Sequence, residues 1–143
     1  MKQLKVGLLG GGSWGTTVAS LVARNAPAVL WARDPATVEE INAQHTNARY
    51  LPGAKLHESL RATADIAEAS AEVDVVAVGV PSQGFRGALG AIRGHIRPWV
   101  PVISLTKGLE AGSGKRMTEI IAEVLPGHPA GVLTGPNLAR EVR

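Results

Sequence analysis

The sequence predicts an α/β fold built on a mainly parallel sheet with helices on both faces, and three observations support this prediction. Short apolar runs alternate with segments of helical periodicity along the whole chain. The run at 73–80, VDVVAVGV, is apolar almost throughout, which is typical of a strand covered on both faces. With 143 residues, 45% of them hydrophobic, the chain has the size and composition of one globular domain.

The first half of the chain begins with a buried strand that runs directly into glycines. The segment Asn25-Ala26-Pro27 stops the first helix. Asp34 is placed to cap the second helix, with Pro35 at its first position. The predicted elements are a strand at 4–9, a helix at 14–24, a strand at 28–32, a helix within 33–44 and an irregular loop at 45–57.

The second half repeats the alternation of strands and helices. Pro81, in the segment VPSQ, is expected to end the strand that precedes it and to shape the edge of the sheet. The predicted elements are a weak helix around 64–71, a strand at 73–80, a helix at 84–96, a strand at 100–106, a helix at 115–125 and a strand at 130–135.

The glycines between the first strand and the first helix form the pattern G-x-G-x-x-G, with Gly10, Gly12 and Gly15 as its members. In this context the pattern predicts a Rossmann-type dinucleotide-binding turn. Gly10 permits the tight turn, Gly12 leaves room for a pyrophosphate, and Gly15 lets the helix approach the strand. The free N–H groups of the helix N-terminus would face the phosphates. Gly11 has no role in this pattern, and we expect it to tolerate alanine best of these glycines.

The choice between NAD and NADP depends on the end of the second strand, which has the sequence LWARDP. An acidic residue there normally accepts from the ribose 2′-hydroxyl in NAD-binding domains. Asp34 is better explained as a helix cap, so Arg33 is free to stack on the adenine or to meet a 2′-phosphate. We therefore expect both cofactors to bind, with NADP favoured.

Three further loops follow strands and meet at the same edge of the predicted sheet, where ligands of such folds bind. Lys107 follows the strand at 100–106 and can hold a phosphate or carboxylate as a point charge. Gly135 and Asn137, in the segment TGPN, follow the final strand. Together with VPSQ, these loops predict a cleft for a dinucleotide and a small anionic substrate.

Several other classes of function are disfavoured by the sequence. The net charge of +3 carries no clustered basic face of the kind that binds nucleic acid, and Arg86, Arg93 and Arg97 are interpreted as a solvated helix face. The four histidines lack the spacing of metal ligands. No G-x-S-x-G or Walker sequence is present. The absence of cysteines and of a long apolar run favours a cytoplasmic protein without integral membrane association.

The motifs also resemble a known family. GGGSWGTTVA, LWARDP, NARYLPG, VPS, SLTKGLE and TGPNLARE occur in the order found in bacterial NAD(P)-dependent glycerol-3-phosphate dehydrogenase, over essentially the whole chain. The resemblance implies interconversion of dihydroxyacetone phosphate and glycerol 3-phosphate for phospholipid synthesis. The residues it implies for the cofactor, besides the three motif glycines, are Ser13, Trp14, Arg33, Tyr50, Lys107 and Ala139. Those it implies for the substrate are Lys107, Gly135 and Asn137.

Two departures from the family pattern follow. Asn137 stands where the family commonly has serine, and it remains polar. The family continues into a helical domain that carries the general acid–base lysine and most of a dimer interface. The resemblance therefore implies that residues 1–143 are the N-terminal cofactor-binding part of a longer enzyme, which is a homodimer in its full form and has its catalytic lysine beyond Arg143. Such a chain would bind the cofactor but lack turnover.

Two other interpretations stay open at the level of sequence. One is a different reductase of the same architecture, acting on a hydroxy acid or on a ketopantoate-type substrate. The other is a non-catalytic module that senses dinucleotides and acts on a partner.

Overall fold

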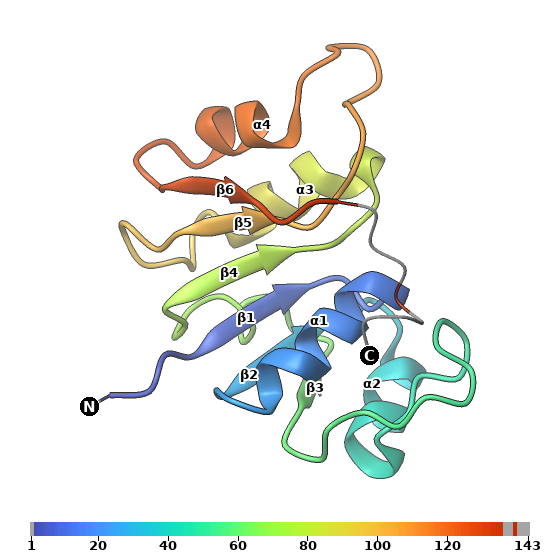
Figure 1. Cartoon of the computed structure of the whole chain (residues 1–143). Coiled ribbons are helices and arrows are strands. Elements are labelled where there is room, and N and C mark those ends of the chain that lie inside the picture. The colour runs from blue at the N-terminus through green and yellow to red at the C-terminus, as the bar shows by residue number, and fades with distance from the viewer. Residues whose placement is uncertain (1, 136–138, 140–143) are drawn as a thin grey trace.

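A computed structural model describes residues 2–135 and 139 of the chain (Figure 1). Strands and helices alternate as the sequence predicts, except that β4 follows β3 without a helix between them. The strands are β1 (Val6–Leu9), β2 (Ala28–Trp31), β3 (Arg61–Thr63), β4 (Val75–Val78), β5 (Val102–Ser104) and β6 (Ala130–Val132). The helices are α1 (Ser13–Ala23), α2 (Pro35–Gln44), α3 (Ser82–Ile92) and α4 (Met117–Val124).

The strands form one six-stranded parallel sheet in the order β3-β2-β1-β4-β5-β6. The chain starts at the centre with β1, extends to one edge through β2 and β3, and returns to the centre to build the other half. The direction of travel therefore reverses between β1 and β4, and the fold is the Rossmann-type α/β architecture that the sequence predicts.

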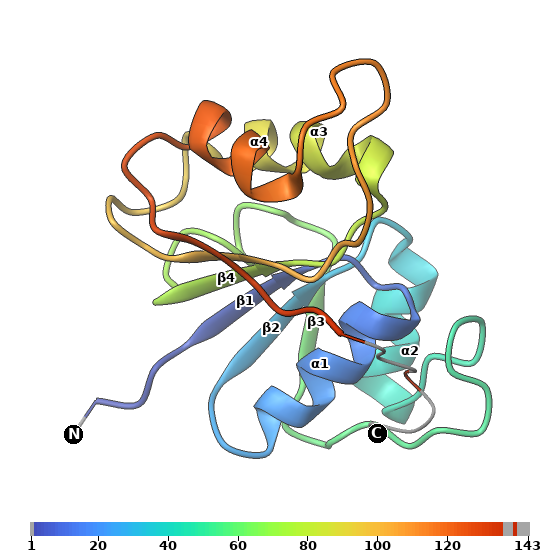
Figure 2. The same ribbon diagram turned by 45° about the horizontal axis from the view of Figure 1, so that its top comes forward.

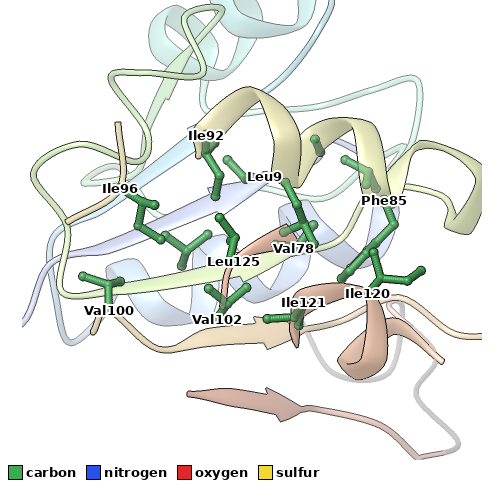
Figure 3. Packing of buried hydrophobic residues seen from close by; sticks show 14 of the residues in the cluster. Leu9, Val78, Phe85, Ile92, Ile96, Val100, Val102, Ile120, Ile121 and Leu125 are labelled. Carbon is green, nitrogen blue, oxygen red and sulfur yellow. The ribbon is translucent and has the colours of Figure 1, made fainter. Parts of the chain in front are cut away.

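The helices cover the two faces of the sheet in pairs (Figure 2). Side chains alternate between faces along a strand, so Leu8 and Leu9 of β1 enter different clusters. Leu8 packs in the cluster that includes α1 and α2, whereas Leu9 packs in the cluster that includes α3 and α4. Figure 3 shows this second cluster, which is largely aliphatic around Phe85. Burial on both faces explains why the strand sequences are almost continuously apolar.

Two details of residues 61–71 differ from the prediction. Strand β3 was not anticipated, because three residues are too few to show a pattern and their pairing with β2 defines them. The predicted helix at 64–71 is wrong: this segment forms successive turns. The Ser70 hydroxyl donates to the carbonyls of Ile66 and Ala67, which offers the backbone an alternative to a continuous helix.

The capping of α2 confirms the role predicted for Asp34. Its carboxylate accepts from the Ala36 backbone N–H at 2.9 Å, and Pro35 occupies the first helical turn. Strand β4 ends at Val78, two residues earlier than Pro81 would require, and Pro81 is the N-cap of α3. Among the helices of residues 2–135, none is long and apolar enough to cross a membrane.

Candidate functional site

The site lies at the edge of the sheet where the strands end. The last residues of the six strands are paired across the sheet in one row, namely Thr63, Trp31, Leu9, Val78, Ser104 and Val132. The loops that follow the strands therefore leave from the same edge. This row places the glycine turn of residues 10–15 beside the loops that begin at Gly79, Leu105 and Leu133.

The glycine turn is built by close contacts of backbone with backbone. Gly10 has a φ of +118°, and a Cβ there would lie 2.8 Å from the carbonyl carbon of Gly79. A Cβ on Gly15 would lie only 2.2 Å from the carbonyl oxygen of Gly10. The tight turn at Gly10 and the close helix approach at Gly15 are thus confirmed. Gly79, which the sequence interpretation placed inside a strand, is the third partner in this packing.

Gly11 contradicts the sequence expectation, whereas Gly12 has the open space that the expectation requires. A Cβ on Gly11 would lie 2.8 Å from the Cβ of Ala32, so the expectation that Gly11 tolerates alanine best is wrong. The reason is tertiary, because Ala32 follows β2 and is buried against the turn. A Cβ on Gly12 would meet nothing within 4 Å. The turn is therefore open at Gly12, the position assigned to a pyrophosphate.

Among the described residues, no side chain caps the N-terminus of α1 at this open position. Gly12 is the N-cap and supplies no side-chain cap, and the first turn of the helix carries no acidic residue. The first amides of a helix lack partners within the helix and carry a partial positive charge. The exposed Ser13 and the half-buried Trp14 are the first side chains of this helix. Free amides, open space and the absence of a carboxylate fit the phosphates of a dinucleotide.

Arg33, which is predicted to distinguish the cofactors, follows β2, and Tyr50 is a second predicted cofactor contact. Arg33 is exposed and makes no ion pair within the described part of the chain, while its neighbour Asp34 is engaged in capping. Tyr50 is 43% exposed, and the guanidinium carbon of Arg49 lies 5.2 Å from the centre of its ring. Both predicted contacts are thus accessible, and no other described residue forms an ion pair with Arg33.

Lys107 and Gly135 are brought together by the structure. The Lys107 ammonium donates to the Gly135 carbonyl at 2.7 Å, which joins the loop after β5 to the loop after β6. Thr106 fixes the start of the Lys107 loop by donating from its hydroxyl to the Val80 carbonyl at 2.6 Å. Asn137 lies outside the described residues. Ala139 is half-buried and packs against the same hydrophobic cluster as Trp14.

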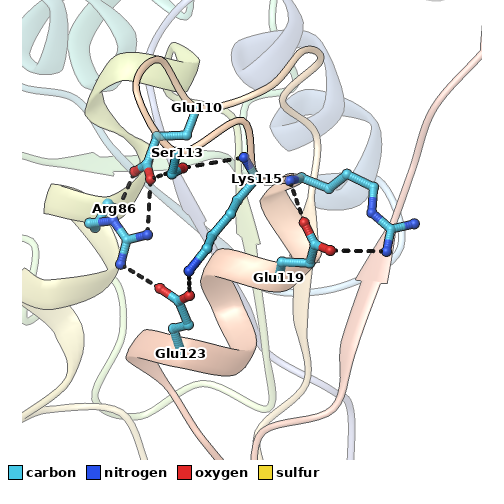
Figure 4. Close-up of polar contacts among 7 residues, drawn as sticks. Arg86, Glu110, Ser113, Lys115, Glu119 and Glu123 are labelled. Carbon is cyan, nitrogen blue, oxygen red and sulfur yellow. Dashed lines mark hydrogen bonds and ion pairs between the residues drawn. The ribbon is translucent and has the colours of Figure 1, made fainter.

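The residues after Lys107 are anchored by a network of charges, shown in Figure 4. Arg86 of α3 donates to both carboxylate oxygens of Glu110, at 2.8 and 2.9 Å, and also pairs with Glu123. Lys115 pairs with Glu123 as well. The hydrogen bonds from Arg86 and then from Ser113 lower the pKa of Glu110 to about 2.

The interpretation of Arg86, Arg93 and Arg97 as a solvated face is wrong for Arg86 and Arg97, which make ion pairs, while Arg93 is exposed. Arg86 joins α3 to Glu110 and α4, and Arg97 donates to the Val73 carbonyl and to Asp74. The sequence pattern shows only that the arginines recur at helical spacing. Glu110 lies 24 residues from Arg86, and Asp74 lies 23 residues from Arg97. These carboxylate partners could not be identified from the spacing of the arginines.

The sequence interpretation also missed Asn47, whose side chain is fully buried. Its amide donates to the Gly11 carbonyl at 2.9 Å and to the Thr16 hydroxyl at 3.0 Å. No spacing rule links Asn47 to the glycine turn. Asn47 is the first residue of the motif NARYLPG, but that motif gives no role to its side chain.

The fold and this edge define a class: the chain is a Rossmann-type domain with its glycine turn at the point where the strand order reverses. The family model described as "NAD-dependent glycerol-3-phosphate dehydrogenase N-terminus" matches residues 5–143. The chain therefore belongs to this family.

Relatives and solved structures agree with this assignment. The chain is 68% identical, over 140 residues and 98% of its length, to glycerol-3-phosphate dehydrogenase (NAD(P)+) 2 of Sphingopyxis alaskensis. It is 57% identical, over 99% of its length, to glycerol-3-phosphate dehydrogenase (NAD(P)+) of Mycobacterium avium. The crystal structure of glycerol-3-phosphate dehydrogenase from Coxiella burnetii matches 98% of the chain with a TM-score of 0.90 and 33% identity. The chain spans 42% of the first two relatives and 43% of the third.

Proposed function

We propose that residues 1–143 serve as the dinucleotide-binding domain of an NAD(P)-dependent sn-glycerol-3-phosphate dehydrogenase. The observation that carries the proposal is the shared edge: the open glycine turn at Gly12 and the Lys107–Gly135 pair leave the sheet from strand ends in one row. Cofactor and a phosphorylated substrate can therefore meet there. The named relatives are NAD(P)+-dependent enzymes for glycerol 3-phosphate.

The residues assigned to the cofactor surround the turn. Gly12 gives room for the pyrophosphate, and the N-terminus of α1, with Ser13 and Trp14, faces it. Arg33, which follows β2, and Tyr50 are exposed, and we assign them to the adenosine half. Ala139 and Lys107 complete the set. The bound nicotinamide supplies a hydride acceptor or donor, and the role of this chain is to hold and orient it.

The residues assigned to the substrate lie on the β5 and β6 side. The Lys107 ammonium has three N–H donors, of which one is used on the Gly135 carbonyl. The remaining donors are available to an anionic or carbonyl oxygen, so Lys107 positions dihydroxyacetone phosphate or glycerol 3-phosphate. We assign Asn137 to the same substrate on the sequence alone.

Reduction of a ketone requires a proton as well as a hydride. We place the proton donor outside residues 1–143, as the family resemblance implies. The expected result is that this chain binds NADPH and reduces dihydroxyacetone phosphate negligibly. Rapid oxidation of many NADPH molecules per protein molecule by the purified chain, in the presence of dihydroxyacetone phosphate, would contradict this placement.

A titration tests the cofactor preference, for which we propose NADP over NAD. NADPH and NADH are titrated separately into the chain and its variant Arg33→Asp, with binding followed by nucleotide fluorescence. If Arg33 meets the 2′-phosphate, the variant weakens NADPH by about tenfold and leaves NADH nearly unchanged. Arg24→Asp, at the far end of α1, is the matched control because it makes the same change in net charge. Equal effects of the two variants would eliminate Arg33 as the residue that selects the cofactor.

A further inference from the structure

Asn47 is a buried amide that connects two segments of the candidate site. It lies in the loop of residues 45–60 between α2 and β3, and its side chain is 0% exposed. One Nδ2 hydrogen bond goes to the Gly11 carbonyl and the other to the Thr16 hydroxyl. Asn47 thus holds a peptide of the glycine turn and a residue of α1 from the same atom.

The chemistry of the Gly11 carbonyl determines which way this amide points. A carbonyl oxygen only accepts, so the NH2 group of Asn47 must face it. Within the described residues, the Gly11 carbonyl accepts from no other donor. The consequence is that Asn47 Oδ1 is buried without a partner in the same part of the chain. Burying an unpaired acceptor is unfavourable. The amide nevertheless has the orientation that donates to the Gly11 carbonyl, which indicates that this hydrogen bond outweighs the unpaired Oδ1.

Gly11 is also closely packed. A Cβ on Gly11 would lie 2.8 Å from the Cβ of Ala32 and 3.8 Å from Thr37. Gly11 is therefore confined by Ala32 at its Cα and by the hydrogen bond from Asn47 at its carbonyl. The next residue, Gly12, is the open position of the turn and the N-cap of α1. A shift of the Gly11 carbonyl would rotate the amides that follow it.

The loop that carries Asn47 is itself anchored. The Glu40 carboxylate of α2 accepts from the Thr46 hydroxyl at 2.8 Å and from the Ala48 N–H at 2.7 Å. Leu51 of the same loop is buried against α1 in the hydrophobic cluster of that face. The loop that carries Asn47 is therefore held in place by contacts outside the glycine turn.

We propose that Asn47 is a positioning residue for pyrophosphate binding: it sets the orientation of the Gly11–Gly12 peptide and so the direction of the amides at the N-terminus of α1. This inference rests on the proposed function, because it assumes that a dinucleotide binds at the turn. It adds a residue outside the glycine motif to the binding machinery. Asn47 acts through the turn and need not touch the cofactor.

The test compares Asn47→Leu with Asn42→Leu in this chain. Leucine removes the donors at similar size. Asn42 is a matched control because its side chain also makes two hydrogen bonds, to the carbonyl and N–H of Ala62, away from the turn. The probes are NADPH, which contains the pyrophosphate, and adenosine 2′-monophosphate, which lacks it. Both affinities are measured by calorimetry, with thermal unfolding followed in parallel.

Asn47→Leu is expected to weaken NADPH by about tenfold and to change the affinity for adenosine 2′-monophosphate by less than about twofold. Asn42→Leu is expected to leave both affinities within about twofold, even where it lowers the melting temperature as much. A loss of NADPH affinity equal in the two variants, or an equal loss for both probes in Asn47→Leu, would overturn the proposal, because either result is that of general destabilisation.

Two further measurements keep the inference testable under other outcomes. If Asn47→Leu does not fold, Thr16→Val removes one of the two anchors of the amide at constant side-chain size and is expected to weaken NADPH by about threefold. An unchanged NADPH affinity in Thr16→Val then counts against the proposal.

If the wild-type chain binds no NADPH, the proposed function fails. The positioning of the turn is then judged from NMR amide shifts of residues 10–16, which must change in Asn47→Leu and not in Asn42→Leu.

Discussion

The glycine turn of residues 10–15 and the lysine loop of residues 107–116 leave the same edge of the sheet but are held by different forces. The turn is held by backbone contacts and one buried amide, and a single added methyl group would collide with backbone at Gly10 or Gly15. The lysine loop is held by the ion pairs of Arg86, Glu110 and their neighbours, on partly exposed side chains. Its Gly108, Gly112 and Gly114 have open space around them, but each has a positive φ that favours glycine.

This difference suggests how the two halves of the site respond to change. Close packing depends on volume and is nearly insensitive to salt or pH. Ion pairs on exposed side chains depend on protonation and are screened by salt. We therefore expect the cofactor side of the site to be rigid and intolerant of substitution, and the lysine loop to respond to solution conditions.

The largest effect is expected for Gly15→Ala. Its Cβ would lie 2.2 Å from the Gly10 carbonyl oxygen, which is backbone and cannot move without opening the turn. We expect a loss of about 3 kcal/mol or more in the free energy of unfolding, measured by urea denaturation. Gly12→Ala is the control, since its Cβ meets nothing within 4 Å. It should change stability by no more than about 1 kcal/mol, yet weaken NADPH binding. Equal destabilisation by both substitutions would contradict the contact argument.

A second prediction concerns the contact between Gly11 and Ala32. Gly11→Ala should destabilise by about 1–2 kcal/mol, because its methyl group would lie 2.8 Å from that of Ala32. Ala32→Gly removes the opposing methyl group. The double variant should therefore be more stable than the sum of the single effects by about 1 kcal/mol, as measured in a double-mutant cycle by denaturant unfolding. Strict additivity would show that the two positions do not interact.

A third substitution places the same methyl group where there is room. Gly87 is an exposed interior residue of α3, and a Cβ there would meet nothing within 4 Å. Gly87→Ala should raise the free energy of unfolding by about 0.5–1 kcal/mol, because alanine loses less backbone entropy in a helix. Urea denaturation gives the sign directly. If Gly87→Ala lowered the free energy of unfolding, the losses measured for glycine-to-alanine substitutions at the turn could not be attributed to steric contact alone.

The parts of the site that the sequence predicted correctly are those set by neighbouring residues. Gly10 and Gly15 follow from a turn motif between a strand and a helix, and the Asp34 cap follows from the proline beside it. Such features depend on local backbone geometry, which short patterns encode.

What the sequence did not predict is set by contacts between distant segments. Gly11 is crowded by Ala32, which is 21 positions away, and Asn47 reaches Gly11 across 36 positions. Arg86 and Glu110 are 24 positions apart. Strand β3 exists only through its pairing with β2. Each of these needs the folded chain to bring its partners together, and no periodicity in the sequence marks them.

The smallest effect, and the one that contrasts most with the turn, is expected for the lysine loop in acid. Arg86 lowers the pKa of Glu110 from 4.5 to about 2. A carboxyl group whose pKa is lower in the folded chain stabilises the fold above pH 4.5, and this contribution is lost as the pH falls toward about 2. Glu110→Gln should therefore be less stable than wild type at pH 6, and the difference should shrink below pH 4.5 and at high salt.

Urea denaturation of both proteins at pH 6, 4 and 3 measures this difference. Glu72→Gln is the matched control, because Glu72 is exposed and makes no ion pair within the described residues. It should show no pH-dependent difference from wild type. Gly15→Ala should lose the same stability at each pH, since its collision involves no titrating group. If Glu110→Gln also lost the same amount at every pH, the lysine loop would be held by packing, and the contrast between the two loops would fail.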